Sequence, residues 1–128
     1  MNRFWVWLLL SVGCVLTSCA GPQPKLPQGA KNISRYSSHN MTSLTFSISE
    51  DAFLTWADGL GFPKAKLTSI ASSSDKTSFF IREDNTPLDL VVIRNGFHGW
   101  EATNTKGGSV LVAFDRDAGK AFYVQRSR

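Results

Sequence analysis

His98 and Glu101 are the two side chains best suited by type and spacing to acid–base chemistry. An imidazole titrates near neutral pH, and a neighbouring carboxylate can orient it or share its proton. The two positions lie three apart in Phe97–Thr103, a run that reads as a strand, and an odd separation puts them on opposite faces. We therefore interpret both as strand surface residues. Because no nucleophile motif accompanies them, the sequence predicts a protein that is not an enzyme.

Asp115-Arg116-Asp117-Ala118-Gly119 has the D-x-D-x-G letters that open a calcium-binding loop. The twelfth position of such a loop is Arg126, where a bidentate Glu is needed. A hairpin turn with Gly119 in a left-handed conformation explains the same letters. A zinc site is disfavoured too, because His98 is the one histidine after residue 41 and no cysteine follows residue 19. We expect no metal and no other cofactor.

Both cysteines lie in or next to an apolar N-terminal run. The run extends from Phe4 to Leu16 after a short positive segment that contains Arg3, and it includes Cys14. It is shorter than the roughly 20 apolar residues that a permanent membrane helix needs. Leu16-Thr17-Ser18-Cys19 closes the run with an aliphatic residue, two small residues and a cysteine.

This stretch resembles the signal peptide and lipobox of bacterial lipoproteins. The resemblance implies that residues 1–18 are removed and that Cys19 becomes the lipidated first residue, whose acyl chains hold the protein in a membrane. Ala20 stands where Asp signals inner-membrane retention in enterobacterial lipoproteins, which implies an outer-membrane location in a Gram-negative envelope and leaves its face open. The alternatives are an uncleaved anchor and a weaker lipobox at Ser11-Val12-Gly13-Cys14.

Residues 19–40 are interpreted as a flexible tether that follows the lipidated cysteine. They contain Pro22, Pro24 and Pro27 and few aliphatic side chains, which disfavours a helix. Such a segment reaches at most about 70 Å when stretched. The formal charge of the whole chain is +4, but from Met41 onward ten basic side chains balance ten acidic ones. A domain without net positive charge is a poor binder of nucleic acid.

The folded domain is expected over residues 41–128, with one helix near its start. Ser49 reads as the N-cap, and Glu50 and Asp51 follow in the first turn, where carboxylates favour the helix dipole. Apolar residues then recur with helical spacing from Phe53 through Trp56 to Leu60, and Pro63 blocks continuation. The pattern predicts a helix of about three turns with Trp56 in the core.

The rest of the domain reads as strands separated by turns. Period-two or all-apolar runs predict strands at Leu44–Ile48, Leu67–Ser72, Thr77–Glu83, Leu88–Arg94, Phe97–Thr103, Ser109–Phe114 and Lys120–Gln125. Asn95-Gly96 predicts a type I′ hairpin turn, and Gly107-Gly108 predicts a second turn.

These elements predict an α+β domain in which the helix packs on a curved antiparallel sheet of about six to seven strands. A small closed β-barrel is the alternative. Leu88–Arg94 is apolar on both faces, which is typical of a central strand. Its second face must be covered by the helix, by another sheet layer or by a partner.

The functional hypothesis is a non-enzymatic binding or assembly module that contacts another envelope protein and the membrane, with no nucleic-acid partner and no evident small-molecule substrate. Trp100 belongs either in the core or at the rim of a sheet face, where an exposed Trp often anchors an interface. The candidate interface residues are Trp100, His98, Asn95, Gly96, Asp115 and Asp117. The alternative function is an inhibitor or immunity protein that masks a cell-wall hydrolase or toxin by inserting the turn at Asn95-Gly96 or at Asp115–Gly119.

Overall fold

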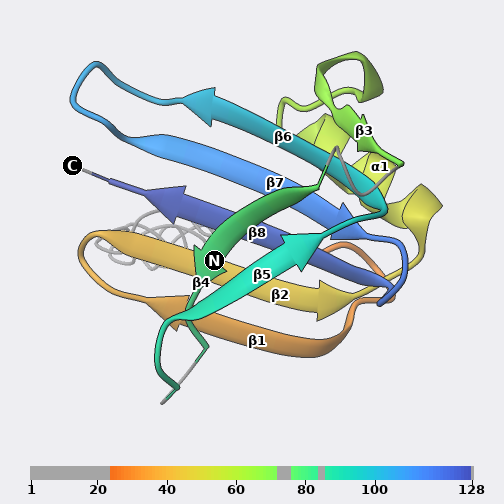
Figure 1. The fold of residues 1–128 in the computed structure, drawn as a ribbon, viewed down its shortest axis with the longest axis horizontal. Helices are drawn as coiled ribbons and strands as arrows, with labels where there is room; N and C mark the ends of the chain where they lie inside the picture. The colour runs from red at the N-terminus through yellow and green to blue at the C-terminus, as the bar shows by residue number, and fades with distance from the viewer. Residues whose placement is uncertain (1–23, 72–75, 84–85, 128) are drawn as a thin grey trace, which may run out of the picture.

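Six strands form one antiparallel open sheet, and two further strands form a hairpin that crosses it (Figure 1). The computed structural model describes residues 24–71, 76–83 and 86–127. The sheet order is β1-β2-β8-β7-β6-β3, and β4 pairs with β5. The elements are β1 Lys31–Ser37, β2 Met41–Ser47, α1 Glu50–Gly59, the 3-10 turn η1 Lys64–Lys66, β3 Thr68–Ile70, β4 Thr77–Ile81, β5 Asp89–Ile93, β6 Gly96–Ala102, β7 Ser109–Asp115 and β8 Lys120–Arg126. The predicted α+β class is confirmed, and the barrel alternative is wrong because the sheet stays open between β1 and β3.

Helix α1 forms where its local pattern predicts it. The side chain of Ser49 accepts a hydrogen bond of 3.3 Å from the backbone N–H of Ala52, which satisfies one of the free donors of the first turn. Phe53, Trp56 and Ala57 are the buried residues of the helix, so its apolar stripe faces the sheet.

The helix and one face of the sheet enclose the first core. Phe53 stacks on Phe114 of β7 with ring centroids 5.1 Å apart, and Trp56 meets Phe46 of β2 edge-on at 5.1 Å. Trp56 is 8% exposed, as its spacing predicted. The buried members of this core are Leu44, Phe46, Phe53, Trp56, Ala57, Phe62, Phe97, Val112, Phe114, Ala121 and Tyr123.

The β4–β5 hairpin lies on the opposite face of the sheet and forms the second core. Phe79 of β4 packs edge-on against Phe122 of β8, with ring centroids 5.4 Å apart. The hydroxyl of Ser43 donates a hydrogen bond of 2.6 Å to the carbonyl oxygen of Arg82, next to the hairpin turn. The guanidinium of Arg82 lies 5.1 Å from the centre of the Tyr36 ring on β1. The buried members of this core are Ile70, Phe79, Ile81, Ile93, Ala113, Phe122 and Val124.

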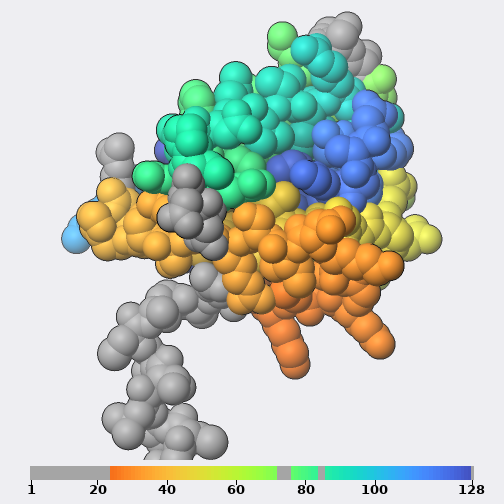
Figure 2. All heavy atoms as spheres, turned by 90° about the horizontal axis from the view of Figure 1, so that it is seen from below, coloured from red at the N-terminus to blue at the C-terminus, as the bar shows by residue number. Residues whose placement is uncertain are grey.

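The segment that precedes β2 belongs to the fold, so the interpretation of residues 19–40 as a flexible tether is wrong for the part that the structure describes. Trp56 Nε1 donates a hydrogen bond of 2.9 Å to the carbonyl oxygen of Lys25, and Leu26 packs against the first core. Strand β1 then pairs with β2 along one edge of the sheet, and its orange side chains lie on the surface in Figure 2. Backbone pairing with β2, rather than burial of side chains, holds this strand at the edge of the sheet. Its sequence therefore needs no alternation of apolar and polar residues.

Strand β5 is not the central strand that Leu88–Arg94 predicted. It pairs only with β4, and the hairpin turns one face toward the second core and the other face outward. Ile93 is fully buried on the inner face, whereas Leu90 is 50% exposed on the outer face. The hairpin that contains this apolar run therefore covers one face of the main sheet. No other described element covers the outer face of the hairpin itself.

Asn95-Gly96 is a corner between the two sheets and not the predicted hairpin turn. No pairing joins β5 to β6, since β6 lies between β3 and β7 in the larger sheet. Gly96 has φ +152°, and a Cβ on it would lie 1.8 Å from the carbonyl oxygen of Phe114. The glycine is required because β6 begins here in close contact with the backbone of β7, which leaves no room for a side chain.

Candidate functional site

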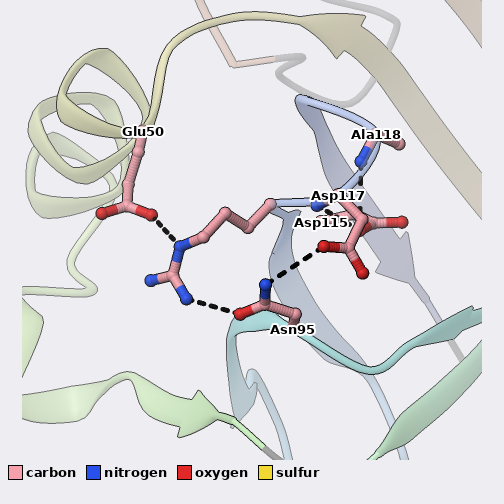
Figure 3. A network of polar contacts seen from close by, with 6 residues as sticks. Glu50, Asn95, Asp115, Asp117 and Ala118 are labelled. Atoms are coloured by element: carbon pink, nitrogen blue, oxygen red, sulfur yellow. Dashed lines mark hydrogen bonds and ion pairs between the residues drawn. The ribbon is translucent and has the colours of Figure 1, made fainter.

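The predicted interface residues fall into two groups at different places on the molecule. Asn95, Gly96, Asp115 and Asp117 come together at the corner beside the start of α1, and we call this group, with Arg116 and Glu50, the polar corner (Figure 3). His98 and Trp100 lie along β6, on the face that carries the hairpin.

Arg116 links the parts of the polar corner. Its Nε pairs with a carboxylate oxygen of Glu50 on α1, and its Nη1 donates to the side-chain oxygen of Asn95. Asn95 Nδ2 in turn donates to Asp117 at 3.1 Å. Glu50 comes from α1, Asn95 from the corner between the two sheets, and Arg116 and Asp117 from the β7–β8 turn, so these bonds tie three parts of the fold together (Figure 3).

The β7–β8 turn has the hairpin conformation that its letters predicted. Asp115 pairs with Lys120, Gly119 has φ +63°, and one carboxylate oxygen of Asp115 accepts from the backbone N–H groups of Asp117 and Ala118 at 3.1 and 3.4 Å. That carboxylate therefore stabilises its own turn. Across the described ranges, no cluster of three or more His, Cys, Asp or Glu side chains is placed to hold a metal ion.

His98 and Glu101 point to opposite faces of β6, as their odd spacing predicted. His98 lies opposite Ala113 of the second core, and Glu101 lies opposite Val110, which packs against the first core. His98 is half-buried rather than fully exposed, and this burial lowers its pKa from the usual 6.5. No His–Glu pair forms, so this site offers no acid–base couple.

Trp100 is 62% exposed and borders an open groove on the hairpin side of the sheet. We call it the Trp100 groove. Its volume is about 350 Å³, its floor comes from β6, β7 and β8, and its wall is β4, which crosses the sheet in Figure 1. The lining residues are Ser78, Phe79, Phe80, Trp100, Ser109, Leu111, Val124 and Arg126.

A second hollow continues from this groove at Arg126, which lines both. Its volume is about 760 Å³, and Leu88 and Met41 supply its apolar part. The remaining lining residues are His39, Asn40, Gly107 and Ser127. Among the residues that the structure describes, Arg126 and His39 are thus the only ionisable side chains that line the two hollows, and neither hollow is lined by a carboxylate.

Two of the large apolar side chains exposed in the described chain, Phe80 and Trp100, line this groove, and Leu88 lines the adjoining hollow. Phe80 is 45% exposed, Leu90 50%, Leu88 55% and Trp100 62%. Phe80 and Leu90 are opposite one another on the outer face of the hairpin. Sequence reasoning named Trp100 but missed Phe80, Leu111 and Arg126. The adjacent pair Phe79-Phe80 was an available signal, because consecutive strand residues face opposite sides and one of the two rings must point outward.

The predicted lipobox, with Cys19, lies outside the described residues. None of the helices described is long and apolar enough to span a membrane. Comparisons of the chain with protein-family models, with curated proteins and with solved structures find no match.

Proposed function

We propose that this protein is a non-enzymatic binding module of a bacterial envelope, anchored through a lipid on Cys19, that contacts another envelope protein through the Trp100 groove. The observation that carries the proposal is the exposure of Trp100 and Phe80 in one groove, with Leu88 exposed in the adjoining hollow and Leu90 exposed opposite Phe80 on the hairpin. Single exposed apolar residues are ordinary, but a cluster beside a groove is typical of an interaction surface. Exposed Trp residues in particular often supply much of the binding energy of an interface.

The docked N-terminal segment supports a defined orientation for an anchored domain. Lys25 is hydrogen-bonded to Trp56 on the helix side of the sheet. Only six residue steps separate Lys25 from Cys19, and these span at most about 20 Å. An anchor at Cys19 therefore holds the helix side near the bilayer. The Trp100 groove lies on the other face of the sheet, where a partner has access to it.

The anchor is tested by intact-mass analysis of protein purified from membranes. We expect a chain that begins at Cys19 and carries acyl chains, and a Cys19→Ala variant that is soluble or retained as a precursor. A Cys19→Ala protein of mature size that still fractionates with membranes would refute lipidation.

The binding surface is tested by site-specific photo-crosslinking in intact cells. A benzophenone amino acid replaces Trp100 in one strain and Ile33 in a control strain, because Ile33 is also apolar and exposed (46%) but lies on β1. We expect one discrete crosslinked protein from position 100 and none of the same size from position 33. Equal products from both positions, or none from position 100, would contradict the proposal.

The polar corner is the observation that favours the alternative function. Its two turns are bonded to each other through Asn95 and Asp117 rather than left as separate loops, and a rigid corner is what insertion into an enzyme cleft requires. The same photo-crosslinker at Asp117 separates the two functions. A partner captured at position 117 but not at position 100, together with toxin or lysozyme sensitivity in a deletion strain, would favour an inhibitor or immunity protein.

A further inference from the structure

We propose that the Trp100 groove binds an extended segment of the partner polypeptide, which adds to the open edge of β4 as a third strand and carries a carboxylate toward Arg126. This inference rests on the proposed function and specifies the chemistry of the partner. It follows from three features of the groove: an open strand edge, an apolar floor and a positive charge that no described carboxylate pairs with.

The open strand edge belongs to β4. This strand pairs with β5 on one side only, and three consecutive β4 residues, Ser78, Phe79 and Phe80, line the groove. In an antiparallel pair, alternate residues turn their N–H and C=O groups away from the partner strand. No backbone hydrogen bond joins those outward groups of Thr77–Ile81 to another described residue. A two-stranded sheet is marginal by itself, so a third strand on this edge both satisfies these groups and completes the sheet.

The floor of the groove suits the side chains of such a strand. Leu111 and Val124 lie opposite each other on β7 and β8, and Trp100 lies opposite Leu111 on β6. Successive residues of an added strand point alternately toward this floor and toward solvent. An incoming segment with apolar side chains at every second position would therefore bury them against Trp100 and Leu111.

The charge of the groove selects the partner. Arg126 forms no ion pair with another described residue, and no carboxylate among the described residues lines the groove or the hollow beside it. Strand β4 is itself bracketed by Lys76 and Arg82. An acidic side chain on the incoming segment would gain a charge-assisted hydrogen bond from Arg126.

The same charges disfavour a second copy of this chain as the occupant. The longest open edge that another copy offers is β1, which carries Lys31 and Arg35 and no carboxylate. Bringing β1 against Arg126 would place like charges together. A different polypeptide with an acidic segment is the better match.

The test uses a displayed library of random dodecapeptides, selected on the purified full chain and, in parallel, on its Trp100→Ala and Arg126→Glu variants. Lys120→Glu is the matched control, because Lys120 is exposed at the opposite end of the same strand β8. We expect selected peptides to alternate apolar and polar residues and to carry Asp or Glu near one end. A synthetic consensus peptide should bind at least tenfold more weakly to Trp100→Ala and Arg126→Glu, and within twofold of the wild-type affinity to Lys120→Glu. Replacing its acidic residue by Lys should restore binding to Arg126→Glu.

N-methylation of the peptide backbone separates strand addition from a side-chain pocket. If the peptide pairs with β4, single N-methyl groups at every second residue should weaken binding at least tenfold, and those at the intervening residues should have little effect. Affinity that is insensitive to N-methylation, enrichment of basic peptides, or no enrichment over Trp100→Ala would each overturn the proposal. Concentration-dependent dimerisation of the full chain that is lost in Trp100→Ala would also overturn it, in favour of a second copy.

The two proposals fail in distinguishable ways. A discrete crosslinked partner at position 100 without alternating N-methyl sensitivity refutes strand addition and leaves the proposed function standing. Peptide binding with the expected periodicity but no crosslinked envelope protein in cells refutes the proposed function and leaves the chemistry of the groove intact.

Discussion

Replacing Gly96 by Ala should be among the most destabilising single-methyl additions in this domain. A Cβ at this position would lie 1.8 Å from the carbonyl oxygen of Phe114 and 2.9 Å from its carbonyl carbon. Both atoms belong to the backbone of β7, which is paired on both sides, so neither can rotate away as a flexible side chain would.

The expected cost follows from the displacement that the methyl group demands. A Cβ needs about 3.4 Å to its nearest heavy atom for ordinary contact, but the present geometry leaves 1.8 Å between it and the Phe114 carbonyl oxygen. Strands β6 and β7 must therefore move apart by about 1.6 Å at this point. This separation would break the pairing of Gly96 with Asp115 and the 2.8 Å hydrogen bond from Arg116 N–H to the carbonyl oxygen of Asn95. Two lost hydrogen bonds contribute about 1 kcal/mol each, and the unfavourable φ about 1–3 kcal/mol. The total is about 3–5 kcal/mol, a large share of the roughly 5–15 kcal/mol that stabilises a typical domain.

Urea denaturation followed by far-UV circular dichroism measures this cost against two matched glycines. Gly119 has φ +63° but no atom within 4 Å of the point that a Cβ would occupy, so Gly119→Ala should lose only about 1–2 kcal/mol from its left-handed backbone. Gly59 lies in α1 with the same open space, so Gly59→Ala should gain about 0.5–1 kcal/mol. If Gly96→Ala costs no more than Gly119→Ala, the close approach of Gly96 to β7 does not exist as described.

Three further predictions concern the helix, the polar corner and the histidine of β6. Trp56→Phe removes the donor to the carbonyl oxygen of Lys25, so it should lower the free energy of unfolding by about 1 kcal/mol or more. It should also speed trypsin cleavage after Lys25, and unchanged cleavage would mean that this segment is not docked on the helix. Glu50→Gln should lower the free energy of unfolding by less than about 1 kcal/mol, and added salt should remove the difference, because both partners of the Arg116–Glu50 pair are substantially exposed. Burial lowers the pKa of His98 below 6.5, so the unfolded chain binds a proton first as the pH falls, and stability that is full above the unfolded pKa is lost below it. The free energy of unfolding should therefore fall less between about pH 7 and about pH 5 in His98→Gln than in the wild type; equal slopes would refute this assignment.

Local sequence patterns correctly predicted the elements whose structure depends on residues close together in the chain. The helix begins at the Ser49 cap and buries the stripe that its spacing predicted, because capping and helical periodicity act within a few residues of each other. The turn at Asp115–Gly119 formed as predicted for the same reason, since one carboxylate and one left-handed glycine close it.

Patterns failed where pairing partners decided the outcome. Strand β1 has almost no buried side chain and is held by its backbone bonds to β2, so apolar periodicity could not detect it. The apolar run that contains β5 predicts a central strand because its composition reports how apolar each face is, and not which strand lies beside it.

The sequence by itself determined the α+β class, the helix, the turn at Asp115–Gly119 and the presence of an apolar strand whose two faces both need cover. Only the tertiary structure decided that β4 and β5 leave the main sheet, that Gly96 lies in close contact with the backbone of β7, and that Trp100 and Arg126 border one groove. The physical reason is the range of the forces involved. Capping and turn bonds join near neighbours in the chain, whereas a groove depends on strands far apart in the sequence and on which of their edges remain open.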